Sequence, residues 1–391
     1  MQKKLIAMAV AGIVAAPAFA QTSNVTVYGR ANVGFDNYQA TGATAGSAFD
    51  WKGRNRVYDY GSLIGFKGKE DLGNGLNANF VMESGVNMDT GSANGQGGTT
   101  NFSSGTLASR SSYLALGGAF GEIRAGRQDV HWLAGRTNLT GANELGFNEP
   151  IGSGGGGLVN GPAYRTSNVL MYVSPTTQGF NAQVGYIANG ELAPVGVDVN
   201  GKGWTLNLNY NNGPIAVKYD YTTMEAQNAV NSPAAGAPKN TGSKLILGYF
   251  YQGQSHVGLT FNHNKHENSA AVGTIVNAGD DLTQNSWLIN WEHNMGNFRS
   301  LVSFGQAGSI SGMTGAAANS GETKFSDFTL AGMYFFSKRT HAYVEYSKIT
   351  NKSQAYADYT GGNMSSAGSG LTFASAGADP RIIGIGLSHY F

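Results

Sequence analysis

The chain has 391 residues, a formal net charge of +1, 58 glycines and no cysteine, and 13% of its residues are charged. Soluble domains average about a quarter charged residues, while an aromatic content of 11% argues against an intrinsically disordered chain. The absence of cysteine excludes a disulfide framework and a thiolate metal site, and the near-zero net charge gives no bulk basic character that would suit nucleic acid.

The first twenty residues, MQKKLIAMAVAGIVAAPAFA, follow the plan of a secretory signal peptide. Two lysines at positions 3 and 4 precede an apolar run that ends in Ala-Phe-Ala at 18–20, which is the pattern of a cleavage site. A membrane anchor is the alternative, but a transmembrane helix needs about 20 apolar residues, and the run from Leu5 to Ala20 is shorter. We therefore expect a cleaved signal peptide at 1–20 and one domain at 21–391. Loss of the two leader lysines would change the net charge from +1 to −1.

Alternation of apolar and polar residues predicts sixteen β-strands after the leader. In the first strand, Val25, Val27 and Phe35 share one face, and Arg30 and Asp36 lie on the other. No apolar run beyond the leader approaches the length of a membrane-spanning helix, but alternating strands of this length can cross a bilayer as a closed barrel. The predicted strands cover 24–36, 57–69, 76–86, 109–118, 121–128, 167–174, 179–189, 202–211, 214–225, 242–252, 254–264, 284–295, 297–306, 324–336, 340–350 and 381–391.

The connections between these strands alternate in length. Short ones such as 211–214 and 296–297 separate long ones, of which 129–166 is the longest. Tight turns at one rim and long loops at the other describe an outer-membrane barrel. A soluble β-sandwich would alternate as well, but the aromatic triplets at 249–251 and 334–336 are typical of the interfacial girdles of a membrane barrel.

The chain ends on another alternating strand, RIIGIGLSHYF. Ile383, Ile385 and Leu387 share one face, and the aromatic Phe391 follows in the same phase. An open sheet edge cannot exist in lipid. We therefore expect this strand to pair with the first and to turn its apolar face and Phe391 toward the membrane.

Several stretches resemble the general diffusion porins of Gram-negative bacteria, of the type common in β-proteobacteria. The resemblance implies an all-β protein: a 16-stranded antiparallel transmembrane β-barrel with long extracellular loops, short periplasmic turns and a third loop folded into the lumen. It also implies a homotrimer, and Phe391 as the assembly signal. The matching stretches are VTVYGRANVGFD at the start, GFKGKEDLGNGL (65–76), SRSSYLALGGAFGEIRAGRQ (109–128), AYRTSNVLMYVSP (163–175) and the terminal Phe391.

The third loop of the resembled family carries the acids of a pore constriction, and here that loop is 129–166. The stretch NELGF at 143–147 is similar to the family motif at the loop tip. The resemblance therefore implies Glu144 as the acid that points into the pore, with Asp129 and Glu149 as further candidates.

A row of basic side chains faces that loop in the resembled family. Arg30 matches the basic position of the first strand, Arg110 that of the fourth strand, and Arg165 the position at the return of the loop. Leu63 stands where the family usually has Arg, so the row is one residue short. Lys67, two residues further along on the same face, is expected to substitute in part.

The strict alternation of strand 109–118 places Arg110 in phase with Leu114, on the lipid side. A bulge or the end of the strand must therefore redirect Arg110 if it faces the lumen. Alternation turns Lys67, Glu83 and Arg124 inward. Each of these charges could also line a wide part of the lumen without any role in a constriction.

An acidic loop opposite a basic wall would create a transverse field across a water-filled pore. The predicted function is accordingly a channel for passive diffusion of small hydrophilic solutes and ions across the outer membrane. A channel specific for a sugar or an anion shares the fold and is the main alternative, and a barrel enzyme or a plugged structural barrel is less well supported. The sequence leaves the sign of ion selectivity open.

The sequence gives no sign of an enzyme or of a cofactor. The glycines at 152–157 are not followed by Lys-Ser or Lys-Thr, and no G-x-S-x-G is present. His263 and His266 are three residues apart without further ligands nearby in the sequence, so a metal site is not expected. The expected partners are outer-membrane lipid and lipopolysaccharide, the barrel assembly machinery, further copies of the chain and the transported solutes.

Overall fold

The protein is built almost entirely from β-strands. The computed structural model describes residues 24–89, 107–130, 145, 151, 158–159, 161–162, 165–189, 201–225, 238–252, 255–359 and 375–391. The predicted signal peptide, 1–20, lies outside these ranges. Within them, the regular helices that occur are the short 3-10 turns η1 (Ser47–Phe49) and η3 (Ser320–Thr323), and no helix there is long and apolar enough to cross a membrane.

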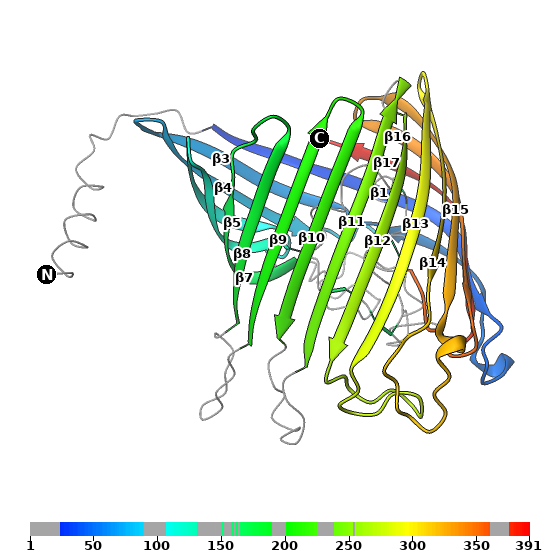
Figure 1. Cartoon of the computed structure of the whole chain (residues 1–391). Helices are drawn as coiled ribbons and strands as arrows, with labels where there is room; N and C mark the ends of the chain where they lie inside the picture. The colour runs from blue at the N-terminus through cyan, green and yellow to red at the C-terminus, as the bar shows by residue number, and fades with distance from the viewer. Residues whose placement is uncertain are drawn as a thin grey trace, which may run out of the picture.

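Long, tilted antiparallel strands make up the wall of the molecule (Figure 1). They agree with the predicted segments in number and order, except in the second segment. The strands are β1 (Asn24–Thr41), β2 (Trp51–Asp59), β3 (Leu63–Gly73), β4 (Leu76–Gly85), β5 (Ser112–Gly118), β6 (Gly121–Asp129), β7 (Arg165–Val173), β8 (Phe180–Asn189), β9 (Gly201–Asn212), β10 (Ile215–Glu225), β11 (Lys239–Tyr251), β12 (Ser255–Glu267), β13 (Leu282–Met295), β14 (Phe298–Ala307), β15 (Phe325–Ser337), β16 (Thr340–Asn351) and β17 (Asp379–Tyr390).

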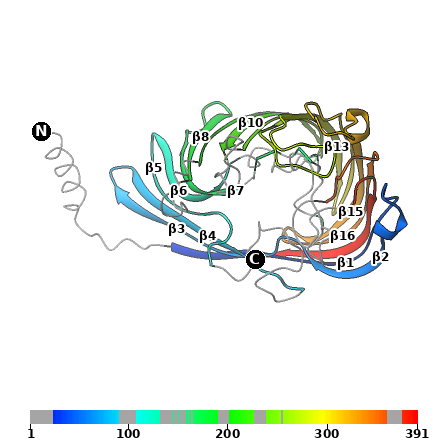
Figure 2. The ribbon, with the colours of Figure 1, turned by 90° about the horizontal axis from the view of Figure 1, so that it is seen from below.

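The first and last strands close the sheet into a barrel. β1 pairs with β17 in a continuous antiparallel register from Arg30 opposite Tyr390 to Thr41 opposite Asp379. β1 also pairs with β2 and with β3, and each strand from β3 to β17 pairs with the next, so the strands form a ring when seen end-on (Figure 2). The β1–β17 seam joins the two ends of the sheet, which a lipid environment requires.

The predicted strand 57–69 is in fact two strands, β2 and β3, which follow one another along the same edge of β1. They share one place in the ring, so the seventeen strands fill sixteen places. The break lies at residues 60–62, where Gly61 has a φ of +66°, a conformation that favours glycine. The predicted single strand was wrong because both pieces alternate, and alternation alone does not reveal a break between them.

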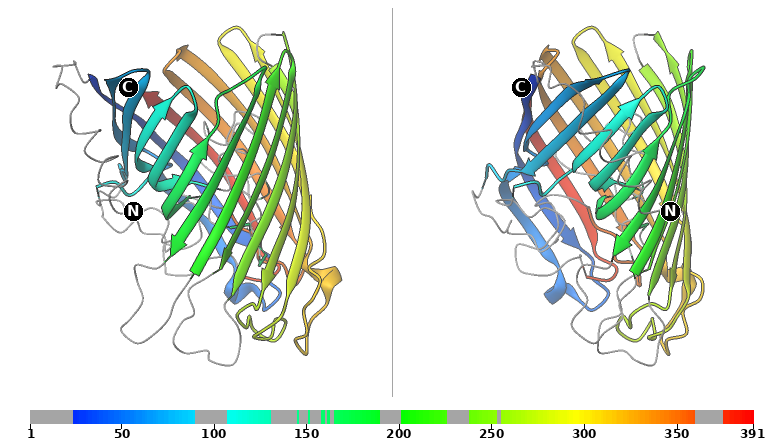
Figure 3. Two further views of the ribbon diagram at one scale, coloured as in Figure 1. Left: turned by 60° about the vertical axis from the view of Figure 1, so that its left-hand side comes forward. Right: turned by 90° about the vertical axis from the view of Figure 1, so that its left-hand side faces the viewer.

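The tight turns and the long connections lie at opposite rims (Figures 1 and 3). Between β3 and β4 the turn has two residues, Asn74 and Gly75, with φ of 52° and 78°. Positive φ at both positions is the signature of a type I′ hairpin turn, whose twist matches the strands that it joins. Phe391 lies at the rim of these tight turns, as the predicted even strand number requires.

The buried apolar side chains lie inside the barrel rather than between layers. The largest cluster covers the inner face of β13 to β17, β1 and β2, and includes Tyr38, Tyr58 and Tyr343. Leu145 and Ile151, from the long connection between β6 and β7, belong to the same cluster. This side of the lumen is therefore packed with side chains.

Candidate pore-lining site

The two faces of the barrel wall differ in chemistry. On β1 the inward Asp36 is 1% exposed, while the neighbouring Phe35 is 50% exposed on the outer face. Residues paired across adjacent strands point to the same face, so the register extends this division around the ring. The inner wall carries mostly amide, hydroxyl and charged side chains, and the outer wall carries mostly apolar ones.

The connection between β6 and β7 contacts the inner wall at each point where its hydrogen bonds are described. The carbonyl oxygen of Leu145 accepts a 3.0 Å bond from Nδ2 of Asn32 on β1, and that of Ile151 accepts a 3.0 Å bond from Nδ2 of Asn262 on β12. Buried backbone carbonyls need such donors, and here inward amide side chains supply them. Further contacts join Val130 to Thr205 and Asn207, Val159 to Asn264, and Gly161 to Asn240.

Arg30 lies at the break between β2 and β3. Its guanidinium donates to the carbonyl oxygen of Tyr60 at 2.9 Å and to that of Gly61 at 2.8 and 3.2 Å. A β-carbon on Gly61 would collide with this guanidinium. Arg30 therefore satisfies the carbonyls that the break removes from the strand ladder, a structural role that the sequence did not indicate.

Arg110 lies beside Glu83. It precedes β5, its side chain is 4% exposed, and its Nε is 3.5 Å from Oε2 of Glu83. The hydroxyl of the inward Tyr28 donates to Oε1 of the same carboxylate at 3.0 Å. Arg110 leaves the phase of the outward Leu114 because it stands outside the regular strand, after Ala108 with a φ of +65°.

Arg165 and Asp129 are paired directly across β6 and β7. Their side chains form a short ion pair, and Nε of Arg165 also donates to Oγ of Ser111 at 3.1 Å. The Ser111 hydroxyl in turn donates to Asp129 at 3.3 Å. A predicted acid and a predicted base therefore neutralise one another on the same wall.

Two further cations cover aromatic rings on this wall. The ammonium of Lys67 lies 5.0 Å from the ring centre of Tyr28, and the guanidinium of Arg124 lies 4.9 Å from that of Tyr113. Arg124 also pairs with Glu122 at 2.9 Å. The inner faces of β1 and β3 to β7 thus bring together Arg30, Lys67, Arg110, Arg165, Glu83 and Asp129.

The predicted acids Glu144 and Glu149 lie outside the described residues. The nearby Leu145 and Ile151 are buried in one cluster of the inner wall and bonded to Asn32 on β1 and to Asn262 on β12.

Several charged residues of the lumen were missed by the sequence analysis. Arg56 forms a two-pronged pair with Asp36, at 2.9 and 2.7 Å, and Lys218 and Lys244 are buried in the inner wall of β10 and β11. Their inward phase within an alternating strand was the signal that could have found them. The resemblance directed attention to the first strands only.

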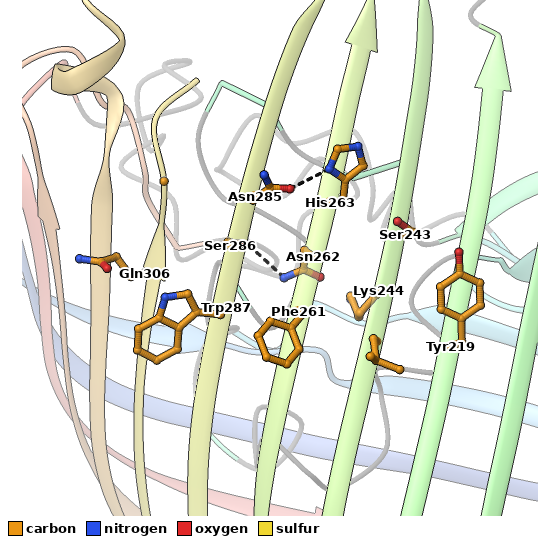
Figure 4. Close-up of a pocket in the computed structure, with 12 residues that line it drawn as sticks. Tyr219, Ser243, Lys244, Phe261, Asn262, His263, Asn285, Ser286, Trp287 and Gln306 are labelled. Atoms are coloured by element: carbon orange, nitrogen blue, oxygen red, sulfur yellow. Dashed lines mark hydrogen bonds between the residues drawn. The ribbon is translucent and has the colours of Figure 1, made fainter. Parts of the chain in front are cut away.

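His263 and His266 fall on opposite faces of β12, since they are an odd number of residues apart in a regular strand. His263 lies on the outer face, where its Nδ1 shares a 2.7 Å hydrogen bond with Oδ1 of Asn285 (Figure 4). No group of three possible metal ligands among His, Cys, Asp and Glu occurs in the described part of the chain.

The outer face around His263 shows the layered surface of a membrane interface. Phe261, Trp287 and Tyr219 line an open groove across β10 to β14, and the polar pair of His263 and Asn285 lies one row nearer the long-loop rim (Figure 4). Aromatic rings with polar groups beside them are typical of the level of the lipid headgroups.

A closed antiparallel barrel with a polar inner wall, an apolar outer wall and aromatic side chains at its interfaces defines an outer-membrane channel protein. A family model described as Gram-negative porin matches residues 7–354. The chain belongs to the Gram-negative porin family.

The similar proteins agree with this assignment. A major outer membrane protein P.IB of Neisseria gonorrhoeae is 28% identical, with 88% of this chain and 92% of that relative covered. An anion-selective porin from Comamonas acidovorans has a TM-score of 0.71 at 22% identity, over 94% of this chain and all of that one. The trimer form of the outer membrane protein OmpT of Vibrio cholerae has a TM-score of 0.64 at 14% identity, over 95% of this chain and all of that one.

Proposed function

We propose that the connection between β6 and β7 forms the constriction of an outer-membrane diffusion channel, opposite the charged wall of β1 and β3 to β7. The observation that carries this proposal is the pair of bonds from Asn32 and Asn262 to the carbonyls of Leu145 and Ile151. They tie two points of the connection to the inner wall at β1 and β12, on the side of the lumen where Leu145 and Ile151 share one buried cluster. Solutes must then pass between this connection and the remaining wall.

The charges of that wall supply the basic side of the constriction. Arg30, Lys67, Arg110 and Arg165 outnumber Glu83 and Asp129 there. Glu144 and Glu149 are the proposed acidic side. Opposed charges in a low-dielectric barrel focus a field across the pore, which orients water and dipolar solutes and disfavours apolar ones.

Single-channel recording in planar bilayers tests the proposal. Stepwise openings, with conductance that scales with bulk salt, are expected for a water-filled pore. The double variant Asn32→Ala/Asn262→Ala should release the connection and change the conductance of each step. The matched control is Asn37→Ala on β1, which removes an exposed hydrogen bond to the amide of Asn55 on β2. An unchanged conductance in the double variant, with folding retained, would refute the role of the connection.

A channel specific for a sugar or an anion remains the second candidate. The observation that favours it is the stacking of Lys67 on Tyr28 and of Arg124 on Tyr113, which provides aromatic surface and positive charge on one wall. Saturation of the current at rising solute concentration would distinguish a binding channel from simple diffusion.

We also propose a homotrimer, in which the outer faces of β17, β1 and β3 to β6 contact neighbouring copies. In the described residues, the exposed Tyr and Trp side chains all lie between Tyr172 on β7 and Tyr334 on β15. The outward positions of β17, β1 and β3 to β6 are instead mostly Gly, Ala, Val, Ile, Leu and Phe. A face without interfacial Tyr or Trp suits another protein surface better than lipid headgroups.

Residues 1–20 are proposed to be the cleaved signal peptide that directs export. Lipopolysaccharide and the barrel assembly machinery are proposed partners, the latter through Phe391. Mass spectrometry of the mature protein is expected to find an amino terminus at Gln21, and an uncleaved terminus would contradict this.

A further inference from the structure

Two tyrosines on the inner wall meet across the seam of the barrel. Tyr343 on β16 is paired with Gly386 on β17. Tyr58 on β2 is paired with Gly34 on β1, and the two glycines are paired with one another at the seam. Residues in register point to the same face, and both tyrosines are buried in the cluster on the inner face. The four residues therefore form one row across four adjacent strands.

The two glycines leave the space that the tyrosine rings occupy. A β-carbon built on Gly34 would collide with the hydroxyl end of Tyr58, and one built on Gly386 would collide with the hydroxyl end of Tyr343. Both rings therefore extend over the backbone of a glycine toward the seam. Their hydroxyl oxygens lie 3.1 Å apart there.

The two hydroxyls connect a carboxylate to the long connection inside the barrel. The hydroxyl of Tyr58 donates to Oε1 of Glu345 on β16 at 2.9 Å. The hydroxyl of Tyr343 donates to Oδ1 of Asn32 at 2.9 Å, and Nδ2 of Asn32 donates to the carbonyl oxygen of Leu145. The four side chains that make these bonds are each at most 3% exposed, so bulk water does not compete for them.

The bond from Tyr343 fixes the orientation of the Asn32 amide. An asparagine amide has a donor end and an acceptor end, so its oxygen must point toward a donor when its nitrogen donates to a carbonyl oxygen. Tyr343 is that donor. With the amide reversed, Oδ1 of Asn32 would face the carbonyl oxygen of Leu145, and two acceptors would meet without a hydrogen between them. The Tyr343 hydroxyl therefore favours the orientation in which Asn32 bonds the connection.

We propose that Tyr343 is a positioning residue, which holds the connection between β6 and β7 in place through the Asn32 amide. Tyr58, anchored by Glu345, supports the ring of Tyr343 from the other side of the seam. The importance of this hold for transport rests on the proposed role of the connection as the constriction. The inference goes beyond that role because it assigns the hold to a row of residues that forms only when the two ends of the chain pair.

A single cysteine at position 145 reports directly on the hold. The chain has no cysteine of its own, and Asn32 bonds the backbone of residue 145, so Leu145→Cys keeps the bond. Because Leu145 is almost fully buried, reaction with a water-soluble maleimide in detergent micelles requires the connection to leave the wall. Adding Tyr343→Phe should raise the labelling rate about fivefold or more, the effect of losing one buried hydrogen bond.

Tyr346→Phe is the matched control, because Tyr346 lies on the outer face of the same strand, opposite the exposed Leu330. It should leave the labelling rate unchanged. Tyr58→Phe keeps the bond from Tyr343 to Asn32 and should raise the rate by a smaller factor than Tyr343→Phe. A rate in Tyr343→Phe equal to that of the control would overturn the proposal.

A double variant separates positioning from a general loss of stability. If Tyr343 acts through Asn32, Tyr343→Phe should not raise the labelling rate further once Asn32→Ala is present, whereas independent effects would multiply. Multiplied rates would overturn the proposal. Single-channel conductance tests the constriction separately. Faster labelling of Tyr343→Phe with an unchanged conductance would refute the constriction and would still support the positioning role.

Discussion

Phe391 and Gly29 join the last strand of the barrel to the first. The amide nitrogen of each donates to the carbonyl oxygen of the other, at 3.1 Å from Phe391 and 3.0 Å from Gly29. The ring of Phe391 lies on the outer face in the space that a side chain at position 29 would fill, because a β-carbon built there collides with it. The terminal aromatic residue and the glycine of the first strand are thus complementary in shape.

Gly29→Val is therefore expected to weaken barrel closure. Overpacking of this kind costs about 1–3 kcal/mol, and the ring must leave its position. The fraction of folded protein after dilution from urea, read from electrophoretic mobility without heating, should fall. Ala31→Val, at the next outward position of β1, is the control and should fold as the parent does. Normal folding of Gly29→Val would show that the ring has room to move.

The Asp36–Arg56 pair should contribute more to stability than the Glu122–Arg124 pair. Asp36 is buried and bound by two nitrogens of Arg56, whereas Glu122 and Arg124 are each about one-fifth exposed. Removing one partner of a buried pair costs about 3–5 kcal/mol, and an exposed pair is worth at most about 1 kcal/mol. Urea unfolding of Asp36→Asn and Glu122→Gln measures the difference. Equal midpoints for the two variants would refute this ranking.

Neutralising Arg110 should shift ion selectivity toward cations if the proposed constriction holds. A unit charge acting over about 4 Å in water is worth about 1 kcal/mol, or a fivefold change in local ion concentration. The permeability ratio of Arg110→Gln, obtained from the reversal potential in a salt gradient, should therefore change by up to about that factor. Arg339→Gln, in the exposed tight turn before β16, serves as the control. A reversal potential equal to that of the parent would show that Arg110 does not contribute to the electric field in the pore.

The connections at 268–281 and 308–324 should separate only in acid. Hydrogen bonds to the carboxylate of Asp280 from the hydroxyl and the amide of Thr314, and from the amide of Asn277, hold its pKa below the ordinary range. Since the folded pKa is lower than the unfolded value of about 3.9, this stabilisation is present above that value. It is lost as the pH falls through the folded pKa.

Limited proteolysis of these connections measures the effect. Cleavage of the parent with an acid-stable protease should be constant between about pH 7 and 5 and should rise below about pH 4. Asp280→Asn should be cleaved faster at every pH, because the charge that strengthens these bonds is absent. If cleavage of the parent rose already near pH 6, a group other than Asp280 would control the contact between the two connections.

The outer wall was more predictable from the sequence than the lumen. Val25, Val27 and Ile385 are exposed on the outer face because period-two alternation follows directly from strand geometry. Alternation failed at element ends: Arg110 stands before its strand, and residues 60–62 interrupt one. Arg30 bonds backbone carbonyls that leave the strand ladder only because of that interruption, so no pattern of residue types predicts these contacts.

Contacts between segments far apart in the sequence could not be predicted from alternation. Asn32 and Leu145 are separated by 113 positions, and their bond depends on where a long connection enters the barrel. The resemblance implied a loop in the lumen, whereas the amides that hold it are ordinary polar residues of alternating strands.

The bond from Asn32 to Leu145 couples the connection between β6 and β7 to the seam of the barrel. Asn32 belongs to β1, the strand that also pairs with β17 at the seam. Local hairpins can form early, but the seam joins residues from the two ends of the chain, and contacts of such long range form slowly. The strand that holds the connection therefore reaches its final position only when the seam forms, which makes docking of the connection and closure of the barrel linked, late events of folding.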